Sequence, residues 1–373
     1  MEQEMDVVQG PSNASTRPLP AAPSEEETEH RNRPKDTKLR QQKLPAWQPI
    51  LTASTVIPAF VLVGVVFIPI GAVLLVASKN VYEQVIPYTN CNSSHNPTLS
   101  CAEFLSVGNN KGLSCKCQPI AVEIKRDIKS KVYFYYGLTN FYQNHRRYVK
   151  SRNDEQLLGS LKTVSDCAPY ELNKTSNREY APCGAVANSF FNDSFVLKLP
   201  NSKEPIKWTY KDTTWPVDKN EKFKNPGQTD HKYLSPEDLK KQFQNFLMPP
   251  NWGNRKVWEL DTEHPDNNGF LNSDFINWMR TSALPNFRKL YRIINSTGVK
   301  EGEPYLLKGT YHLFIDYNYP VTAFHGQKMF IISTTSWAGA KNNFLGIAYI
   351  VVGSLCLING VAFLVIHLKF GKS

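Results

Sequence analysis

The chain has 373 residues, 41% of them hydrophobic, and a formal net charge of +10 at pH 7. This length suits one or two domains and is sufficient to bury a core. The basic residues are spread along the chain, so we interpret the positive balance as facing a membrane or a protein partner and expect no binding of nucleic acid.

Residues 1–49 are expected to form a cytoplasmic N-terminal tail. Residues 1–34 are polar and lack the apolar side chains that would offset the entropy of ordering, so we predict that they are disordered. Residues 35–49 are basic and end in a segment that contains Pro45, Trp47 and Pro49. An indole ring lodges readily among lipid headgroups and proline stops a helix from extending, which predicts an interfacial elbow.

Residues 50–78 form an apolar run of 29 residues without a charged side chain. A bilayer core is about 30 Å thick and a helix rises about 1.5 Å per residue, so this run predicts a transmembrane helix. A buried core helix is the alternative, but core helices are seldom uncharged over such a length. Gly64 and Gly71 offer flat places where a neighbouring helix can approach, and a specific partner in the membrane is expected there.

Residues 79–343 are expected to form an ectodomain with up to three disulfides. Its six cysteines are Cys91, Cys101, Cys115, Cys117, Cys167 and Cys183. In an oxidising compartment such cysteines pair with one another. Cys115 and Cys117 are too close to pair comfortably, so each is expected to take one of the two upstream cysteines, and the last two are expected to pair. A zinc site is disfavoured because the spacing matches no common zinc pattern.

Four glycosylation triplets lie in the same segment. They begin at Asn92, Asn173, Asn192 and Asn295. An Asn-x-Ser/Thr triplet marks a surface loop that is accessible in the secretory pathway, so we predict N-glycosylation at these positions.

Aromatic and β-branched runs in the ectodomain predict more strand than helix. The runs are residues 131–138, 194–199, 310–321 and 328–337. The last two are joined by a short segment around His325 and Gly326 and are predicted to pair with each other in antiparallel fashion. The predicted fold class is a two-span transmembrane protein with a β-rich (α+β), disulfide-bonded, glycosylated ectodomain built on an antiparallel sheet or sandwich.

Helices are predicted at residues 140–149 and 273–284. In the second, Ser273 is placed to cap the first turn, and Phe275, Trp278 and Met279 recur on one face at helical spacing.

Two polar clusters suggest binding chemistry. Residues 144–152, NHRRYVKSR, carry Arg146, Arg147 and Arg152, which could hold a phosphate or contact a partner; we favour a solvated or partner-binding surface. The segment DTEHPDNNGFLNSDF resembles a calcium loop, but aligning its glycine puts His264 and Phe275 where oxygen ligands are needed, so we predict a turn rich in Asn and Asp. We find no phosphate loop, nucleophile elbow or metal box, and expect neither catalysis nor a cofactor.

Residues 344–366 form a second uncharged apolar run, of 23 residues, and predict a second transmembrane helix. Gly346, Gly353 and Gly360 recur in it at seven-residue spacing. Basic residues precede the first run and follow the second, so we expect both the N-terminal tail and residues 367–373 to be cytoplasmic.

Several long motifs occur in order over roughly residues 35–370. They include RQQKLPAWQPILTASTVIP, YYGLTNFYQNHRRYVKSR, APCGAVANSFFND, WMRTSALPNFRKLYR and KNNFLGIAYIVVGS. In these motifs the chain resembles the accessory, or beta, subunit family of phospholipid flippases, also called the cell division control protein fifty or transmembrane protein thirty family.

The resemblance implies a noncatalytic accessory subunit that forms a heterodimer with a type-four P-type ATPase. In this family the accessory subunit supports assembly, exit from the endoplasmic reticulum and activity of the pump, which moves aminophospholipids from the outer to the cytoplasmic leaflet. Similar complexes occupy the endoplasmic reticulum, the Golgi and secretory vesicles, and the plasma membrane, in contact with membrane phospholipid. The elbow near Trp47 is then expected to touch the pump.

The resemblance also implies the disulfides Cys91–Cys117, Cys101–Cys115 and Cys167–Cys183, and it places Asn192 on a family glycosylation triplet. A two-span ligand-gated channel subunit is the main alternative, because it shares the topology and a disulfide-rich ectodomain. Channel subunits assemble as homo-oligomeric rings, however, and these spans show little polar pore lining. A membrane-tethered enzyme would need a nucleophile, a metal or an acid pair.

Overall fold

The computed structural model describes residues 37–45, 52–106, 113–161, 166–200, 202, 204–229, 232–295 and 303–371. The chain divides into Met1–Val56 and Ile57–Ser373, which we describe separately. In the first unit, residues 37–45 include a turn in which Gln41 N donates to the carbonyl of Thr37 over 2.9 Å. The predicted disordered leader and Trp47 lie outside the described residues.

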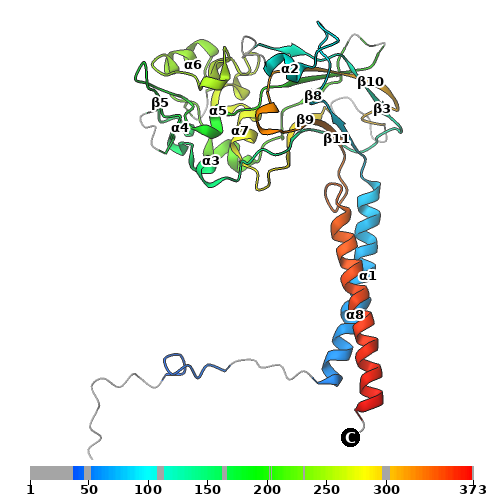
Figure 1. Ribbon diagram of the computed structural model, residues 1–373. Coiled ribbons are helices and arrows are strands. Elements are labelled where there is room, and N and C mark those ends of the chain that lie inside the picture. The colour runs from blue at the N-terminus through cyan, green and yellow to red at the C-terminus, as the bar shows by residue number, and fades with distance from the viewer. Residues whose placement is uncertain are drawn as a thin grey trace, which may run out of the picture. The chain divides into compact units, whose positions relative to one another are not determined.

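Two long helices lie at the predicted spans: the first begins three residues after the predicted start and ends two residues beyond the predicted end, and the second extends its span at both ends. They are α1 (Ala53–Asn80) and α8 (Asn343–Phe370), each of 28 residues, and both are long and apolar enough to cross a membrane. Asn342 caps α8 because its side-chain oxygen accepts from the backbone N–H groups of Phe344 and Leu345. Figure 1 shows the two helices side by side. The protein is therefore a two-span membrane protein.

Two antiparallel sheets form the ectodomain between these helices. The first has the order β1-β11-β4-β9-β8, with β1 Glu83–Pro87, β4 Tyr133–Leu138, β8 Trp208–Thr209, β9 Phe287–Ile294 and β11 Lys328–Ser333. In the second, β10 (Gly309–Tyr317) pairs with β2 (Cys115–Lys116), β3 (Ile120–Ile124) and β7 (Ser194–Lys198). A separate hairpin joins β5 (Leu172–Asn173) to β6 (Arg178–Glu179). The predicted β-rich antiparallel ectodomain is confirmed.

The two sheets face each other across an aromatic core. On β10 every second residue from Tyr311 to Tyr317 is buried, which is the alternation expected of a strand with one face inward. The Phe195 ring of β7 lies 4.9 Å from the Phe330 ring of β11, between centroids, so side chains of the two sheets meet directly. This arrangement is a sandwich.

The predicted pairing of the last two strands with each other is wrong. β10 lies in the second sheet, whereas β11 lies in the first and pairs with β1 and β4. Residues 318–327 join them and include a short 3₁₀ turn, Thr322–Phe324, so the connection is long enough to cross from one sheet to the other. The alternation that predicted the strands carries no information about their partners.

Short helices pack at one end of the sandwich (Figure 1). They are α3 Arg146–Lys150, α4 Asp154–Leu157, α5 Ala185–Asn188, α6 Pro236–Phe243 and α7 Ser273–Met279, whereas α2 (Cys101–Ser106) lies beside β2 of the second sheet. A π-helical turn spans Asp218–Lys222, and 3₁₀ turns span Pro250–Trp252, Val257–Glu259, Pro265–Asn267 and Gly269–Leu271.

Both predicted ectodomain helices are shorter than expected. Only residues 146–150 of the first are helical, and Asn140 has a left-handed φ of 57° that is incompatible with a helix there. The second ends at Met279, and Asn272, one residue before the predicted cap, accepts the hydrogen bond from Phe275 N. Its predicted apolar face is buried: Trp278 is fully enclosed and its Nε1 donates to the Val186 carbonyl over 2.8 Å.

Three disulfides join Cys91 to Cys117, Cys101 to Cys115 and Cys167 to Cys183, with Cα atoms 5.5 to 5.6 Å apart. The first two are nested and tie the segment after β1 to β2. Because the Sγ atoms of Cys91, Cys101 and Cys117 are held in these bonds, their proximity does not represent a set of free metal ligands. Cys356 in α8 is a free thiol.

A buried ion pair lies between the sheets. Lys328 Nζ of β11 lies 2.6 Å from Asp193 Oδ2, and neither side chain is exposed to solvent. The carboxylate also accepts from Tyr88 OH at 2.8 Å and from the backbone N–H groups of Asn318 and Tyr319, each at 2.7 Å. Burial lowers the pKa of Lys328 to about 8, and the facing carboxylate of Asp193 opposes that shift. Every polar atom of the carboxylate is therefore engaged.

Asp193→Leu should destabilise the protein strongly, because it leaves the Lys328 ammonium buried without a counter-charge. Removal of one partner of such a pair costs about 3–5 kcal/mol, whereas the double variant Asp193→Leu/Lys328→Met should regain most of that loss. The measurement is the thermal unfolding midpoint of the purified full-length chain. The Asn192 glycosylation triplet is retained in both variants.

Lys241→Met serves as the matched control, since Lys241 and its partner Asp238 are exposed on α6. An exposed pair contributes at most about 1 kcal/mol, so this midpoint should barely move. An Asp193→Leu chain that unfolds at the wild-type temperature would show that the buried pair does not hold the sandwich together.

Candidate partner-binding surfaces

The glycines of the two long helices face each other within the chain. A Cβ atom built at Gly64 would lie 2.5 Å from Leu357 Cγ and 2.9 Å from the Gly353 carbonyl oxygen. At Gly71 it would lie 2.7 Å from Ile350 Cγ1 and 2.8 Å from the carbonyl oxygen of Gly346. Real Cβ atoms do not approach other atoms so closely, so the close packing of α1 and α8 requires glycine at these positions.

The expectation that these glycine faces receive a separate partner is therefore wrong. Spacing alone cannot tell whether a small-residue face meets another chain or the other span of the same chain. The opposite faces remain exposed and carry branched aliphatic side chains such as Leu62 (64% exposed), Val76 (60%) and Ile358 (64%). A partner in the membrane would meet these outer faces.

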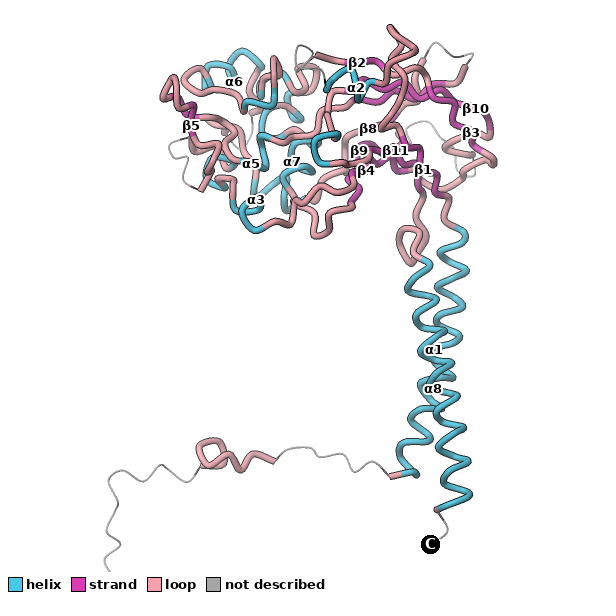
Figure 2. Tube along the Cα trace, viewed as in Figure 1, coloured by secondary structure: helices cyan, strands magenta, loops and turns pink. Residues whose placement is uncertain are grey.

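Hydrogen bonds continue the helix pair into the first sheet. Ser78 Oγ donates to Asn343 Oδ1 over 2.6 Å and accepts from Asn342 N at 3.0 Å. Two residues beyond α1, Tyr82 N donates to Thr334 Oγ1 and Thr334 N donates to the Tyr82 carbonyl, each over 2.9 Å. β1 and β11 then run as neighbours (Figure 2). Hydrogen bonds thus join the end of α1 to the start of α8, and join the two segments that connect these helices to the first sheet.

Of the predicted basic cluster, Arg146 and Arg147 lie exposed on α3 together with Lys150. The helix is held by its inner side, where the Tyr148 hydroxyl lies 2.9 Å from Ser189 Oγ. Burial raises the pKa of Tyr148 to about 12, so it remains a neutral hydroxyl. With Tyr148 turned inward, the three cationic side chains face solvent.

Arg152, the third predicted basic residue, has a different position. Its guanidinium donates to the Met279 carbonyl over 2.9 Å and lies 2.6 Å from the Asp154 carboxylate. Arg152 thus joins the segment after α3 to the C-terminal end of α7. The structure does not group it with Arg146 and Arg147 on the solvent-facing side.

Exposed apolar side chains adjoin α3. Asn144 Nδ2 donates to the Ala283 carbonyl over 2.9 Å, which places the segment after α7 beside the segment before α3. Tyr142 is 56% exposed and Leu284 is 67% exposed. Together with Arg146, Arg147, Val149 and Lys150 they form what we call the α3 face. Aromatic, aliphatic and arginine side chains exposed together are typical of protein interfaces.

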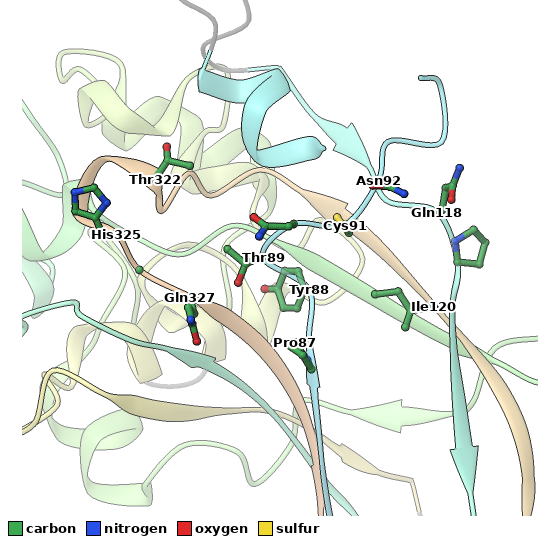
Figure 3. A pocket seen from close by; sticks show the side chains of 13 residues that line it. Pro87, Tyr88, Thr89, Cys91, Asn92, Gln118, Ile120, Thr322, His325 and Gln327 are labelled. Atoms are coloured by element: carbon green, nitrogen blue, oxygen red, sulfur yellow. The ribbon is translucent and has the colours of Figure 1, made fainter. Parts of the chain in front are cut away.

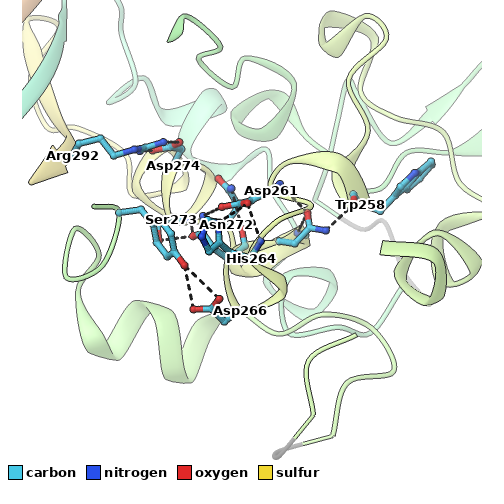
Figure 4. Close-up of polar contacts among 12 residues, drawn as sticks. Trp258, Asp261, His264, Asp266, Asn272, Ser273, Asp274 and Arg292 are labelled. Atoms are coloured by element: carbon cyan, nitrogen blue, oxygen red, sulfur yellow. Dashed lines mark hydrogen bonds and ion pairs between the residues drawn. The ribbon is translucent and has the colours of Figure 1, made fainter. Parts of the chain in front are cut away.

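The segment DTEHPDNNGFLNSDF, which resembles a calcium loop in sequence, forms a turn with internal hydrogen bonds (Figure 4). Asp261 Oδ1 accepts from His264 N at 3.1 Å, and Asp261 Oδ2 accepts from Asn267 Nδ2 at 2.7 Å. Asn268 Oδ1 accepts from the backbone N–H groups of Asp261 and Gly269. The oxygens of Asp261 and Asn268 are thus engaged by donors of the same turn, as predicted for a turn rich in Asn and Asp, whereas Asp266 accepts from Tyr210 OH and Asp274 pairs with Arg292.

The glycosylation triplets occupy different surroundings. Asn92 is exposed, whereas Asn173, Asn192 and Asn295 are half-buried. Asn173 Oδ1 accepts from the backbone N–H groups of Thr175 and Ser176, which closes a turn at the end of β5. Asn192 precedes the buried Asp193, and its carbonyl accepts from Asn318 Nδ2.

A cleft of about 830 Å³ lies beyond the end of β1 (Figure 3). Its walls come from residues 87–92, from Gln118, Pro119 and Ile120, and from the connection before β11, including His325. The lining holds amides, hydroxyls and one histidine, but no carboxylate, lysine or arginine. It brings together no acid and base pair, and so offers no catalytic arrangement of the kind that acid–base chemistry needs.

Sequence reasoning missed Asp193 and Lys328. Asp193 stands inside a glycosylation triplet and Lys328 opens an aromatic strand, and both looked like ordinary surface residues. The available signal was the exceptional position of a lysine at the head of a strand whose next residues are apolar. Nothing in the sequence links it to a carboxylate 135 positions away.

A family model described as the LEM3 (ligand-effect modulator 3) family / CDC50 family matches residues 74–373. The chain belongs to the CDC50 family. Among CDC50 proteins it is 47% identical over 350 residues to cell cycle control protein 50A of Mus musculus, covering 91% of each chain. It is 41% identical over 356 residues to cell cycle control protein 50B of Homo sapiens, covering 91% of this chain and 95% of that relative.

A plant relative extends the comparison. ALA-interacting subunit 3 of Arabidopsis thaliana is 37% identical over 339 residues, covering 90% of this chain and 86% of the relative. The family model's match at residues 74–373 covers the end of α1, the ectodomain and α8. The resemblance inferred from the sequence motifs is therefore confirmed.

Gly353→Leu should separate α1 from α8, because a Cβ at this position would lie 2.9 Å from Ile68 Cγ1. The measurement is disulfide formation between Phe67→Cys and Tyr349→Cys, whose native rings lie 4.9 Å apart, in a Cys356→Ala background. A protease site is inserted between Asn295 and Glu303, so that cleavage gives two fragments with one new cysteine each. All three native disulfides precede this site, so on a non-reducing gel only the engineered disulfide keeps the two fragments together. We expect the cross-linked fraction to fall several-fold.

Val352→Leu is the control, since Val352 is 44% exposed and lies on the outer face of α8. It should leave the cross-linked fraction unchanged. Equal cross-linking in the Gly353→Leu and Val352→Leu chains would contradict the glycine-dependent packing.

Proposed function

We propose that this chain is the noncatalytic accessory subunit of a type-four P-type ATPase that moves aminophospholipids from the outer to the cytoplasmic leaflet. The observation that carries the proposal is membership of the CDC50 family over residues 74–373, together with a relative whose name describes an interacting subunit. In this proposal, ATP hydrolysis and the lipid path belong to the larger subunit of a heterodimer.

The contribution of this chain is binding energy. The α3 face and the outer faces of α1 and α8 are exposed and available to a partner. A subunit favours one conformation of its partner only if it makes different contacts in the two conformations. An ectodomain tied to both spans by the hydrogen bonds at Ser78 and Tyr82 could hold the extracytoplasmic part of a pump in this way.

We also propose that both termini are cytoplasmic and that the ectodomain lies in the lumen or outside the cell. The chain would join its pump in the endoplasmic reticulum, support its exit, and accompany it to the Golgi, secretory vesicles and plasma membrane. Basic residues ahead of the first span and after the second support this orientation. A two-span channel subunit receives less support, because its ring would need a polar lining and the exposed helix faces are mainly aliphatic.

Purification of the tagged full-length chain in mild detergent should recover a P-type ATPase of about equal molar amount, identified by mass spectrometry. Arg146→Glu/Arg147→Glu should reduce that recovery about tenfold, because charge reversal at an interface places like charges together. The control is Lys232→Glu/Lys240→Glu, which changes two exposed lysines near and on α6. This variant should recover as much ATPase as the wild type. Recovery of a homo-oligomeric ring without any ATPase would favour the channel and refute the proposal.

The orientation is tested by glycosidase treatment of the expressed chain. Changing Asn92, Asn173, Asn192 and Asn295 to Gln one at a time should remove the mass of one glycan in each variant. The N-terminal tail holds a further triplet, Asn13-Ala14-Ser15, which is cytoplasmic in this topology, so Asn13→Gln should change nothing. A glycan on Asn13 would reverse the proposed orientation.

A further inference from the structure

The ectodomain ends of both spans are surrounded by cationic side chains. Six exposed cations lie on α1, on the connection between β3 and β4, and just before α8. We call them the collar: Lys79, Lys125, Arg126, Lys129, Lys131 and Lys341. None of the six forms an ion pair with the described residues. Their charge is therefore not consumed within this part of the chain.

Contacts place Arg126, on the connection between β3 and β4, at the level of the helix end. Asn80 is the last residue of α1, and its carbonyl accepts from Arg126 Nη2 over 3.2 Å. The Arg126 guanidinium also lies 6.0 Å from the Tyr82 ring centroid. Lys79 belongs to the last turn of α1, and Lys341 lies two residues before α8. If the two apolar helices span the hydrocarbon, these cations stand at the depth of the lipid phosphates.

Two acidic groups in the same region are already engaged, and a third, Glu123 of β3, is exposed. Asp127 Oδ1 accepts from Lys308 N, and Glu83 pairs with Arg288 over 2.7 Å. The connection between β3 and β4 is itself held in place, since Ile128 and Leu306 form a backbone bridge. The connection between β3 and β4 is thus held in place by its backbone and by Arg126, while Lys125, Lys129 and Lys131 on it are exposed.

A second, independent feature indicates a lipid surface. Trp337, in the turn between β11 and α8, is 76% exposed, and Phe344 at the start of α8 is 78% exposed. Large aromatic rings at the ends of spans are typical of the headgroup region. The headgroup region accommodates both kinds of side chain. Aromatic rings are unfavourable in water, and cations are unfavourable in hydrocarbon.

We propose that the collar binds anionic phospholipid headgroups in the leaflet next to the ectodomain and enriches these lipids around α1 and α8. Lysine and arginine side chains supply the charge, and Trp337 sits among the headgroups beside them. The proposal depends on membrane insertion of the two helices and not on the identity of the partner. For a lipid-translocating complex, the collar would raise the local concentration of its anionic substrate class.

The test uses the full-length chain in nanodiscs of phosphatidylcholine that contain spin-labelled phosphatidylserine or spin-labelled phosphatidylcholine. The ratio of protein-contacting label for the two lipids gives the selectivity at the protein surface. Each basic residue near an anionic surface contributes about a fivefold preference at most. We expect selectivity for phosphatidylserine in the wild type, a decrease at high salt, and a several-fold decrease in Lys125→Gln/Lys129→Gln/Lys131→Gln.

Arg126 is left intact because it holds the end of α1. The matched control, Lys116→Gln/Lys232→Gln/Lys240→Gln, removes three exposed lysines that lie outside the collar, and it should keep the wild-type selectivity. Absence of selectivity in the wild type, or equal selectivity in the two triple variants, would overturn the proposal. So would a collar variant that loses ATPase recovery while keeping lipid selectivity, since the collar would then be a protein-binding surface.

Discussion

The Asp193–Lys328 ion pair is the constraint on which the rest of the ectodomain depends. A charged pair with no solvent exposure is tolerated only if each group is fully hydrogen-bonded, and this requirement brings β1, β7, β10 and β11 to one point. The carboxylate also bonds the chain just after β10, where the polypeptide leaves one sheet for the other. If the two sheets packed in another arrangement, one or both charges would be buried without a partner. The ion pair therefore specifies how the two sheets lie on each other.

Strand β11 connects the buried ion pair to the helix pair. β11 begins at Lys328 and ends at Ser333, which is opposite Glu83 of β1, so the register of these neighbours is set from the buried pair outward. Beyond them, Thr334 and Tyr82 exchange two hydrogen bonds, and Ser78 bonds Asn342 and Asn343 at the ends of the helices. Core, strand pair and helix pair are therefore one connected series of contacts.

The features predicted correctly from sequence are those with a local physical cause. The spans follow from length and hydropathy, and the strands around Phe134, Phe195 and Phe330 follow from aromatic content and alternation. Strand partners, by contrast, depend on contacts between distant residues such as Asp193 and Lys328, which no local pattern encodes. The two-residue strand β2 exists only because β10 lies beside it, so it has no signal of its own.

Close packing of α1 on α8 limits how a membrane partner can be recognised. The glycines that would permit a close approach are already covered, so a partner helix meets mainly branched aliphatic side chains, which lipid tails match equally well. Asn359 is an exception, because its amide is exposed amid the apolar outer face of α8. An amide in hydrocarbon gains from any partner that offers a hydrogen bond. Asn359 is therefore a point at which a partner helix gains specificity within the membrane, and the remainder must come largely from the ectodomain.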